Sequence, residues 1–261
     1  MKKVLLLITG LLFLTAVEVI KVYFIMPFRA GQYSNQISLA FFVNHNILWL
    51  RAVGFLLVIS PILYYLRKGR WWQKSIVALA LVLYGVVVYV CNVQLVAANM
   101  FGGMKEKVFA GSAADTTNRY RDIIGVVING QAKAYPIALI GYHHQLTDTV
   151  GGTPILITYC TLCHTGCVYR PVINGRQTTF LLMGVYHFNA VFQDNQTKSW
   201  WQQSTGKAIA GKLKGAYLPR INSSQTSLHS WLLLYPNSLI LQPDKNYKQE
   251  YADFANGGTV F

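Results

Sequence analysis

Hydrophobic residues are concentrated in the first hundred positions, where they form three long runs separated by short polar segments. The runs cover residues 4–26, 47–66 and 75–98. A helix that crosses the hydrocarbon core of a bilayer needs about 20 apolar residues, and each run is long enough. The pattern therefore predicts three transmembrane helices within residues 1–98.

Charged residues interrupt the first two runs at a few positions. Glu18 and Lys21 lie three apart in the first run, so they can pair on one face of a helix. Arg51 lies near the start of the second run, where a long side chain can extend to the interface, and Pro61 can kink that helix. Charges inside spans suggest function, but transport would need more polar residues than these spans contain.

After residue 98 the pattern changes to short β-prone runs bounded by turn residues. Asn129-Gly130 and Asn174-Gly175 each lie between two such runs and predict two-residue hairpins. Further strands are predicted at residues 153–160, 189–194, 199–203 and 238–243, and a helix is predicted within 224–236, ending before Pro236. The expected fold is a helical membrane anchor, a linker at 99–118 and a mainly-β (β-rich α+β) domain at 119–261.

The composition supports this division. The chain is 53% hydrophobic and 12% charged, whereas soluble domains carry about 25% charged residues. The formal net charge of +14 comes from scattered bases without a basic stripe, so we expect no nucleic-acid partner. Attraction to a membrane surface with anionic lipid is the simpler explanation of the charge.

Basic residues also predict the orientation of the spans. Lys2 and Lys3 precede the first run, and four bases lie within residues 67–74, whereas Arg29 is alone in the loop between the first two runs. By the positive-inside rule, these two basic segments face the cytoplasm, and the C-terminal domain lies outside it. If the first run is instead a cleaved signal peptide, the C-terminal domain still lies outside.

Three cysteines and a histidine lie within eight positions of the stretch TYCTLCHTGCVYR, residues 158–170. Cys160 is predicted to end a strand, and Cys163, His164 and Cys167 to lie in or just after the following turn, at the rim of a sheet. Outside the cytoplasm, Cys160 and Cys163 can form a structural disulfide or a redox pair. That pairing would leave Cys167 as the reactive thiol.

The same residues allow two other interpretations. Cys160, Cys163, His164 and Cys167 are soft ligands suited to copper or zinc, and His143, His144 or His187 could complete such a site. The pattern Cys-x-x-Cys-His also matches covalent attachment of haem c. If the protein is an enzyme, the three cysteines are the catalytic candidates.

Several motifs carry a family resemblance: AYPIALI, TDTVGGTPILITYCTLCHTG, VINGRQTTF and DNQTKSWWQQSTGKAIAGKLKG. Over about residues 124–243 the chain resembles the bacterial and archaeal family called domain of unknown function 3179. The family pattern falls here on Tyr159, Cys160, Leu162, Cys163, Asp194, Thr197, Ser199, Trp201, Gln203, Gly206 and Ala208 to Gly211. The resemblance implies a domain and a site, but no reaction. Together with the predicted orientation, it implies a protein of the inner (cytoplasmic) membrane of a prokaryote, with the C-terminal domain in the periplasm.

The chain departs from this pattern at three places. Thr161 stands where the family usually has proline, His164 stands where it has glycine, and the stretch GVYHFNAVFQD is about one residue shorter. The glycine expected at position 164 speaks against haem, because the histidine of the haem pattern is then local to this chain.

Asp194, Trp201 and Gln203 are candidates for binding a ligand. Trp201 and Gln203 lie two apart, so on a strand they share one face, and an indole beside an amide can hold a small polar ligand. Asp194 can instead begin the turn of residues 194–197 through an Asx hydrogen bond, and Trp201 can belong to the core. Asp148 is expected to cap a turn.

Two functions remain open from the sequence. The first is redox or metal handling by an extracytoplasmic protein through the cysteine cluster. The alternative is a non-catalytic binding or assembly module, in which the cysteines form a structural disulfide and Trp201 and Gln203 face a ligand.

Overall fold

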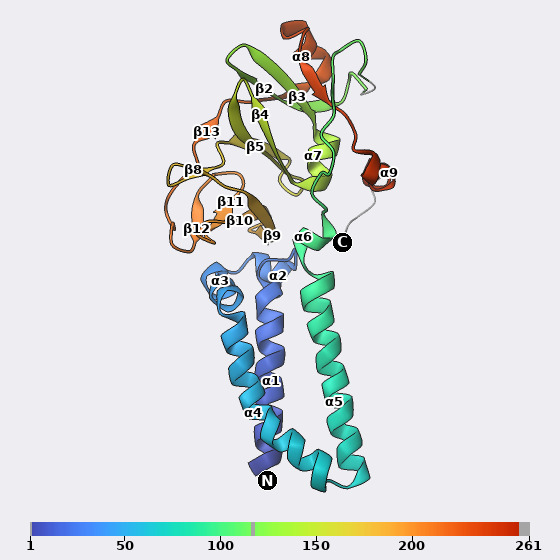
Figure 1. Ribbon diagram of the computed structural model, residues 1–261, viewed down its shortest axis with the longest axis vertical. Helices are drawn as coiled ribbons and strands as arrows, with labels where there is room; N and C mark the ends of the chain where they lie inside the picture. Colours follow the sequence, from blue (N-terminus) through green and yellow to red (C-terminus); the bar gives the residue numbers. More distant parts are fainter. Residues whose placement is uncertain (1, 116–117, 256–261) are drawn as a thin grey trace. The chain divides into compact units, whose positions relative to one another are not determined.

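The computed structural model describes residues 2–115 and 118–255. The chain forms two compact units, one of residues up to Asn99 together with Val185–His187 and the other of the remainder. The first unit is helical and the second is rich in strands (Figure 1). The predicted fold class, a helical anchor followed by a β-rich domain, is confirmed.

The helical unit contains three helices that are long and apolar enough to cross a membrane. They are α1 (Lys2–Tyr23), α4 (Ile47–Lys68) and α5 (Trp71–Tyr89), the last continued to Gln94 by a π-helix, η1 (Val90–Gln94). The third helix thus begins four residues before the predicted start at residue 75 and ends four residues before the predicted end at residue 98. Two short helices that the sequence pattern did not predict, α2 (Arg29–Gln32) and α3 (Ile37–His45), lie between α1 and α4.

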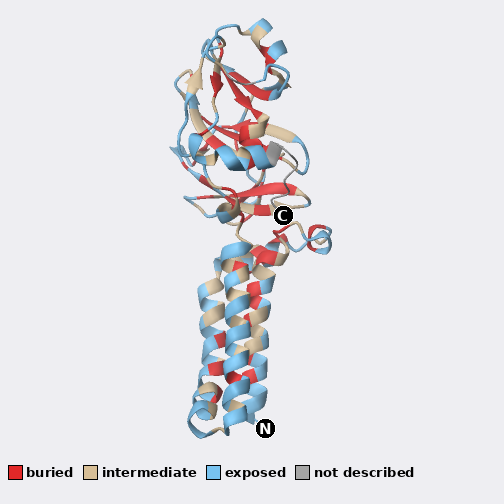
Figure 2. Ribbon diagram, turned by 90° about the vertical axis from the view of Figure 1, so that its right-hand side faces the viewer, coloured by how far each residue is buried: buried red, intermediate tan, exposed pale blue. Residues whose placement is uncertain are grey.

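Glycines allow α1 and α4 to pack closely. A Cβ atom on Gly10 would lie 2.4 Å from a methyl group of Val58, and one on Gly54 would lie 2.3 Å from Leu14. Small residues serve this purpose in membrane helices, where backbones must approach without help from a hydrophobic driving force. The helix α5 is attached less closely, since Val77 is its one buried residue. Figure 2 shows the largely exposed surface of the helices.

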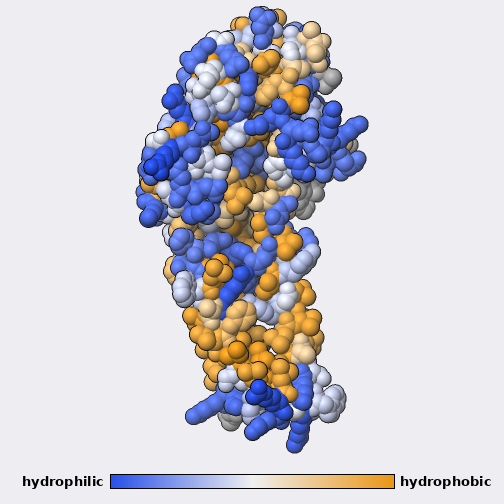
Figure 3. Space-filling model, viewed as in Figure 1, coloured by the Kyte–Doolittle hydropathy of each residue, from blue (hydrophilic) through white to orange (hydrophobic). Residues whose placement is uncertain are grey.

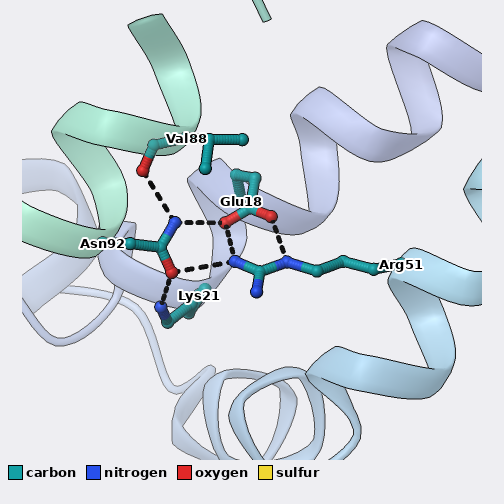
Figure 4. A network of polar contacts seen from close by, with 5 residues as sticks. All are labelled: Glu18, Lys21, Arg51, Val88 and Asn92. Carbon is teal, nitrogen blue, oxygen red and sulfur yellow. Dashed lines mark hydrogen bonds and ion pairs between the residues drawn. The ribbon is translucent and has the colours of Figure 1, made fainter. Parts of the chain in front are cut away.

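A polar network joins the three long helices near the ends that lie away from the N-terminus (Figure 4). Glu18 accepts two hydrogen bonds from the Arg51 guanidinium, at 2.6 and 2.8 Å, and a third from the Asn92 amide at 2.9 Å. Asn92 Oδ1 in turn accepts from Arg51 and from Lys21. The expected pairing of Glu18 with Lys21 is therefore corrected: Arg51 is the ion-pair partner, and its side chain turns into the bundle to reach Glu18.

The β-rich unit contains three main sheets. The first has the order β1-β15-β3-β2-β14, with β15 and β3 parallel and the other pairs antiparallel. Its strands are β1 (Phe109–Ala110), β2 (Asp122–Ile128), β3 (Gln131–Pro136), β14 (Ser224–Ser227) and β15 (Leu239–Leu241).

The second sheet has the order β13-β6-β5-β4 and the third the order β12-β11-β10-β9. Their strands are β4 (Gln145–Val150), β5 (Thr153–Cys160), β6 (Thr165–Tyr169), β13 (Arg220–Ile221), β9 (Phe180–Tyr186), β10 (Asn189–Asp194), β11 (Trp200–Gln202) and β12 (Ala208–Ala210). A small hairpin, β7 (Val172–Ile173) and β8 (Arg176–Gln177), and the helices α6 (Ala97–Met100), α7 (Ile137–His143), α8 (Leu228–Leu234), η2 (Lys245–Tyr247) and α9 (Lys248–Ala255) complete the described chain.

The first sheet is covered on both faces. Ile124 and Val126 of β2 belong to a core shared with α7 and the second sheet, whereas Ile123 packs with Leu228 and Trp231 of α8. A Cβ atom on Gly125 would lie 2.4 Å from the Trp231 ring, so glycine is needed there for α8 to approach the sheet. The alternation along β2 therefore separates two hydrophobic layers.

Both predicted Asn-Gly hairpins are confirmed. Asn129-Gly130 joins β2 to β3 and Asn174-Gly175 joins β7 to β8, with positive φ angles at all four residues, as in type I′ turns. The predicted helix at 224–236 is partly wrong, because its first four residues form β14 and only α8 is helical, capped by Ser227. The helix α7 was not predicted.

Candidate functional site: the cysteine cluster

The hairpin of β5 and β6 positions the cysteines. Cys160 pairs with Thr165 at the end of the hairpin, and Thr158 pairs with Cys167. Cross-strand partners and residues two apart on a strand share one face, so Cys160 and Cys167 lie on the same face of the second sheet. As predicted from the sequence, Cys160 ends a strand and Cys163 lies in the following turn.

The three thiols differ in accessibility. All are free in the structure, and Cys163 is exposed whereas Cys160 and Cys167 are buried. Burial, together with a hydrogen bond to the Cys163 thiol, raises the pKa of Cys160 to about 11. The Cys160 thiol also donates to the carbonyl of Phe188 at 3.6 Å. Cys163 is therefore the accessible sulfur, with Cys160 beneath it; their disulfide stays a prediction.

Two side-chain amides position the Cys163 sulfur. The Asn189 amide donates to Cys163 Sγ at 3.0 Å and to Gln203 Oε1 at 3.1 Å. Gln203 Nε2 in turn donates to Thr158 Oγ1 at 3.1 Å and to the carbonyl of Thr165 at 2.9 Å. Gln203, expected to face a ligand, is thus buried and hydrogen-bonded within the protein, and it links β11 to the cysteine hairpin.

Asn189 was missed by the sequence analysis. It precedes its hydrogen-bond partners Gln203 and Ser204 by more than ten positions, and it follows Cys163 by still more. No motif around Asn189 distinguishes it from a solvent-facing asparagine. The contact arises because the start of β10, in the third sheet, lies against the turn of the β5–β6 hairpin in the second sheet.

Cys167 lies in a separate environment. Its thiol donates to the carbonyl of Ser204 at 3.7 Å, and the Arg220 guanidinium donates to its sulfur at 3.6 Å. Burial raises the pKa of Cys167, although Tyr169 and Arg220 act in the opposite direction. Cys167 is buried, and its expected role as the reactive thiol beside a Cys160–Cys163 disulfide stays a prediction.

His164 is exposed and adopts a left-handed backbone conformation, with φ of +49°. Glycine adopts this conformation without a steric cost. The glycine that the resemblance places at position 164 is therefore explained by the turn. The turn requires this backbone conformation whichever residue stands at position 164, so the position itself does not imply a ligand.

The other histidines proposed for a metal site have partners of their own. His143 is hydrogen-bonded to the carbonyl of Gly102 and, at 2.6 Å, to the hydroxyl of Tyr251. His144 Nδ1 lies 3.2 Å from the carbonyl of Tyr159. Within residues 2–115 and 118–255, no group of three or more His, Cys, Asp and Glu side chains is arranged to hold a metal ion. Copper, zinc and haem thus gain no support from the geometry.

Asp194 and Trp201 form a closed network that does not include the cysteines. Asp194 is fully buried and accepts hydrogen bonds from the hydroxyl and backbone N–H of Thr197, the N–H of Ser199 and, at 3.0 Å, the indole of Trp201. Burial opposes ionisation, but these hydrogen bonds outweigh it and lower the pKa of Asp194. This is the Asx-type turn that the sequence allowed, and the ligand role of both residues stays a prediction.

Asp148 does not cap a turn. It lies in β4, where Oδ2 accepts from Lys133 at 2.8 Å and from the Tyr135 hydroxyl at 2.7 Å. Burial and the nearby carboxylate raise the pKa of Tyr135. This buried pair joins the first sheet to the second.

One acceptor beside the cysteine face is unused. Gln145 pairs with Thr158 across β4 and β5, and its Nε2 donates to the carbonyl of Phe180 at 2.8 Å. Among the residues that the structure describes, Gln145 Oε1 is the buried side-chain oxygen without a hydrogen-bond partner.

Comparison with known proteins identifies one family. A family model with the description "Protein of unknown function (DUF3179)" matches residues 106–257, more than half of the chain. This confirms the resemblance found from the motifs and extends it at both ends. No curated protein and no solved structure matches the chain.

Proposed function

Since the chain belongs to this family, whose description names no activity, we propose a function from the geometry: membrane-anchored thiol–disulfide exchange at Cys163 and Cys160. The observation that carries the proposal is an exposed thiol, Cys163, that is hydrogen-bonded to a buried one, Cys160, and to the Asn189 amide. Exchange needs an accessible attacking sulfur and a second sulfur within reach of it.

The proposed reaction has two steps. The Cys163 thiolate attacks one sulfur of a substrate disulfide, a mixed disulfide forms, and the other substrate sulfur leaves and takes up a proton. The Cys160 thiolate then attacks Cys163 Sγ, the Cys160–Cys163 disulfide forms, and the second substrate sulfur leaves as a thiol. Two electrons pass from the protein to the substrate, and a dithiol substrate runs the same steps in reverse.

The proposed substrate is a disulfide or dithiol on an extracytoplasmic polypeptide. Disulfides persist outside the cytoplasm. That compartment follows from the proposed orientation, in which the basic end of the helical unit faces the cytoplasm.

The test uses the full-length protein in detergent and a small aromatic disulfide that releases a coloured thiol. We expect two equivalents of coloured thiol from the wild type, with the Cys160–Cys163 disulfide found by mass spectrometry after alkylation. Cys160→Ser should stop at the mixed disulfide after one equivalent, and Cys163→Ser should react very slowly. Cys167→Ser is the matched control and should behave as the wild type.

Two results would exclude the proposal. One is that Cys167→Ser slows the reaction as much as Cys163→Ser does. The other is that Cys160→Ser still releases two equivalents, since its buried partner would then play no part. In either case the cysteines belong to a structural cluster, as in a binding module.

A further inference from the structure

A groove lies on the helical unit where α1 and α5 begin and α4 ends. Its volume is about 330 Å³, which is within the range of small-molecule sites. Apart from Gln73, the lining is apolar or aromatic, and it includes Leu7, Ile8, Tyr65, Trp72, Ile76 and Val77. The groove is therefore suited to a hydrocarbon chain.

The packing of the helices explains why this groove exists. Gly10 and Gly54 bring α1 and α4 into close contact, whereas α5 buries Val77 alone among its residues. The third helix thus leaves apolar side chains of α1 and α5 uncovered beside Tyr65 of α4. In a bilayer such a surface is filled by an acyl chain or by another helix.

Basic residues lie at the same end of the helical unit as the groove. Six exposed bases belong to this end of the unit: Lys2, Lys3, Arg67, Lys68, Arg70 and Lys74. Glu18, the one acid among the first hundred residues, lies near the other end of α1. The backbone N–H of Arg70 donates to the side chain of Gln73 at 2.8 Å, which ties this base to the lining. Figure 3 shows the hydrophilic atoms at this end, next to the hydrophobic surface of the helices.

We propose that the groove binds an anionic phospholipid, with one acyl chain along Ile8, Ile76 and Val77 and the phosphate held by Arg70 and Lys74. Basic pockets between membrane helices select anionic headgroups. Trp72 lines the groove and lies between Arg70 and Lys74 in the chain, and tryptophan is enriched at the membrane–water interface. A second copy of the chain in the same orientation would bring its own six bases against these, and like charges oppose that contact.

The experiment measures phospholipid bound to the full-length protein by native mass spectrometry in detergent. The probes are phosphatidylglycerol and phosphatidylcholine with identical acyl chains, added in equal amounts. We expect the wild type to retain phosphatidylglycerol preferentially. Arg70→Gln should reduce that preference about fivefold and Arg70→Gln with Lys74→Gln about twenty-five-fold, because each base near an anionic headgroup contributes about fivefold. Arg29→Gln, which removes an exposed base at the other end of α1, should change nothing.

A second pair of variants tests the acyl chain. Val77→Phe fills the groove and should reduce retention of both lipids, whereas Val82→Phe, on the exposed surface of α5, should not. Equal retention of the two lipids by the wild type would overturn the proposal, as would an equal effect of Arg29→Gln and Arg70→Gln. A dimer that Val77→Phe converts to a monomer would show that a second copy fills the groove. Should Val77→Phe not fold, the charge variants still decide the question.

Discussion

Glu18 in the helical unit and Asp194 in the β-rich unit are both carboxylates without exposed surface. Their partners differ in kind. Glu18 accepts hydrogen bonds from Arg51 and Asn92, which lie 33 and 74 positions away on two other helices. Asp194 accepts from donors that lie at most seven positions away, and none of them carries a charge.

This difference separates two tasks of a buried carboxylate. The donors of Asp194 belong to its own turn and to the following strand, so the carboxylate specifies local backbone geometry. The donors of Glu18 come from distant segments, so that carboxylate specifies which helices associate and in what register. Replacing each residue in turn tests this distinction.

The largest effect is expected for Asp194→Ala. The substitution removes the acceptor of the buried indole N–H of Trp201 and that of the backbone N–H of Thr197, and each unsatisfied donor costs about 1–3 kcal/mol. We expect a loss of about 4 kcal/mol in the free energy of unfolding of the β-rich unit, measured by denaturant and tryptophan fluorescence. Asp194→Asn keeps one acceptor and should cost less; a loss below about 1 kcal/mol for the alanine variant would contradict the local role.

Acid should reveal the same residue. The pKa of Asp194 is lowered on folding from 3.8, so its contribution to stability is present above pH 3.8 and is lost as the pH falls through the lower, folded value. Wild-type unfolding free energy should therefore decline below about pH 4 more steeply than that of Asp194→Asn. Equal slopes would show that Asp194 is not ionised in the folded state.

A smaller loss, about 2 kcal/mol, is expected for Glu18→Gln. The variant leaves the Arg51 guanidinium without a counter-charge, and breaking a buried ion pair costs about 3–5 kcal/mol when both partners are fully desolvated. The Arg51 side chain is 24% exposed, which reduces this cost. The double variant with Arg51→Gln should be less destabilised than the sum of the singles when unfolding is followed in mixed micelles. Additive losses would show that the pair is not coupled.

His143 should make the stability of the β-rich unit sensitive to mild acid. Burial lowers the pKa of His143 from 6.5, although the Gly102 carbonyl and Asp244 act in the opposite direction. Burial also lowers the pKa of the neighbouring His144. The unfolded chain therefore binds more protons than the folded one below about pH 6.5. The free energy of unfolding should decrease as the pH drops through that value.

The matched variants for this effect are His143→Phe and His229→Phe, since His229 is exposed. We expect His143→Phe to reduce the slope of unfolding free energy against pH between 6.5 and 5, and His229→Phe to leave it unchanged. An unchanged slope in both would assign the sensitivity to another group.

The smallest effect is expected for His164→Gly. The left-handed conformation costs a side-chain-bearing residue about 1–2 kcal/mol, and glycine loses part of that gain to chain entropy. Thermal unfolding should show a stabilisation of at most about 1 kcal/mol, with thiol exchange at Cys163 unchanged. A loss of exchange would mean that the imidazole takes part in the chemistry.

Features set by neighbouring residues were predictable from the sequence. The three apolar helices follow from the length of their runs, and the hairpins at Asn129-Gly130 and Asn174-Gly175 follow from the conformations those residues adopt. The Asx turn at Asp194 and the strand end at Cys160 are equally local. The motif resemblance was specific because it combined several such segments.

Features set by distant residues were not predictable. The sequence spacing of Glu18 and Lys21 suggested a pair, but the partner of Glu18 comes from another helix. Apolar runs such as residues 134–140 do not distinguish strand from helix by periodicity, so α7 was missed. Which of Cys163 and Cys167 is exposed depends on the register of the β5–β6 hairpin, and the Asn189 contact depends on a third sheet.

The strand order of the first sheet has a consequence for the time course of folding. The central strands β2 and β3 follow one another along the chain, but the strands that flank them, β14 and β15, come much later in the sequence. Until residue 227 has emerged, the β2–β3 hairpin has both edges unpaired, and the edge of β3 stays unpaired until residue 241 has emerged. A two-stranded hairpin is at best marginally stable by itself. The β-rich unit therefore has to complete its core late and in one step, and a nascent chain that stops before β15 should remain unfolded and exposed to proteases.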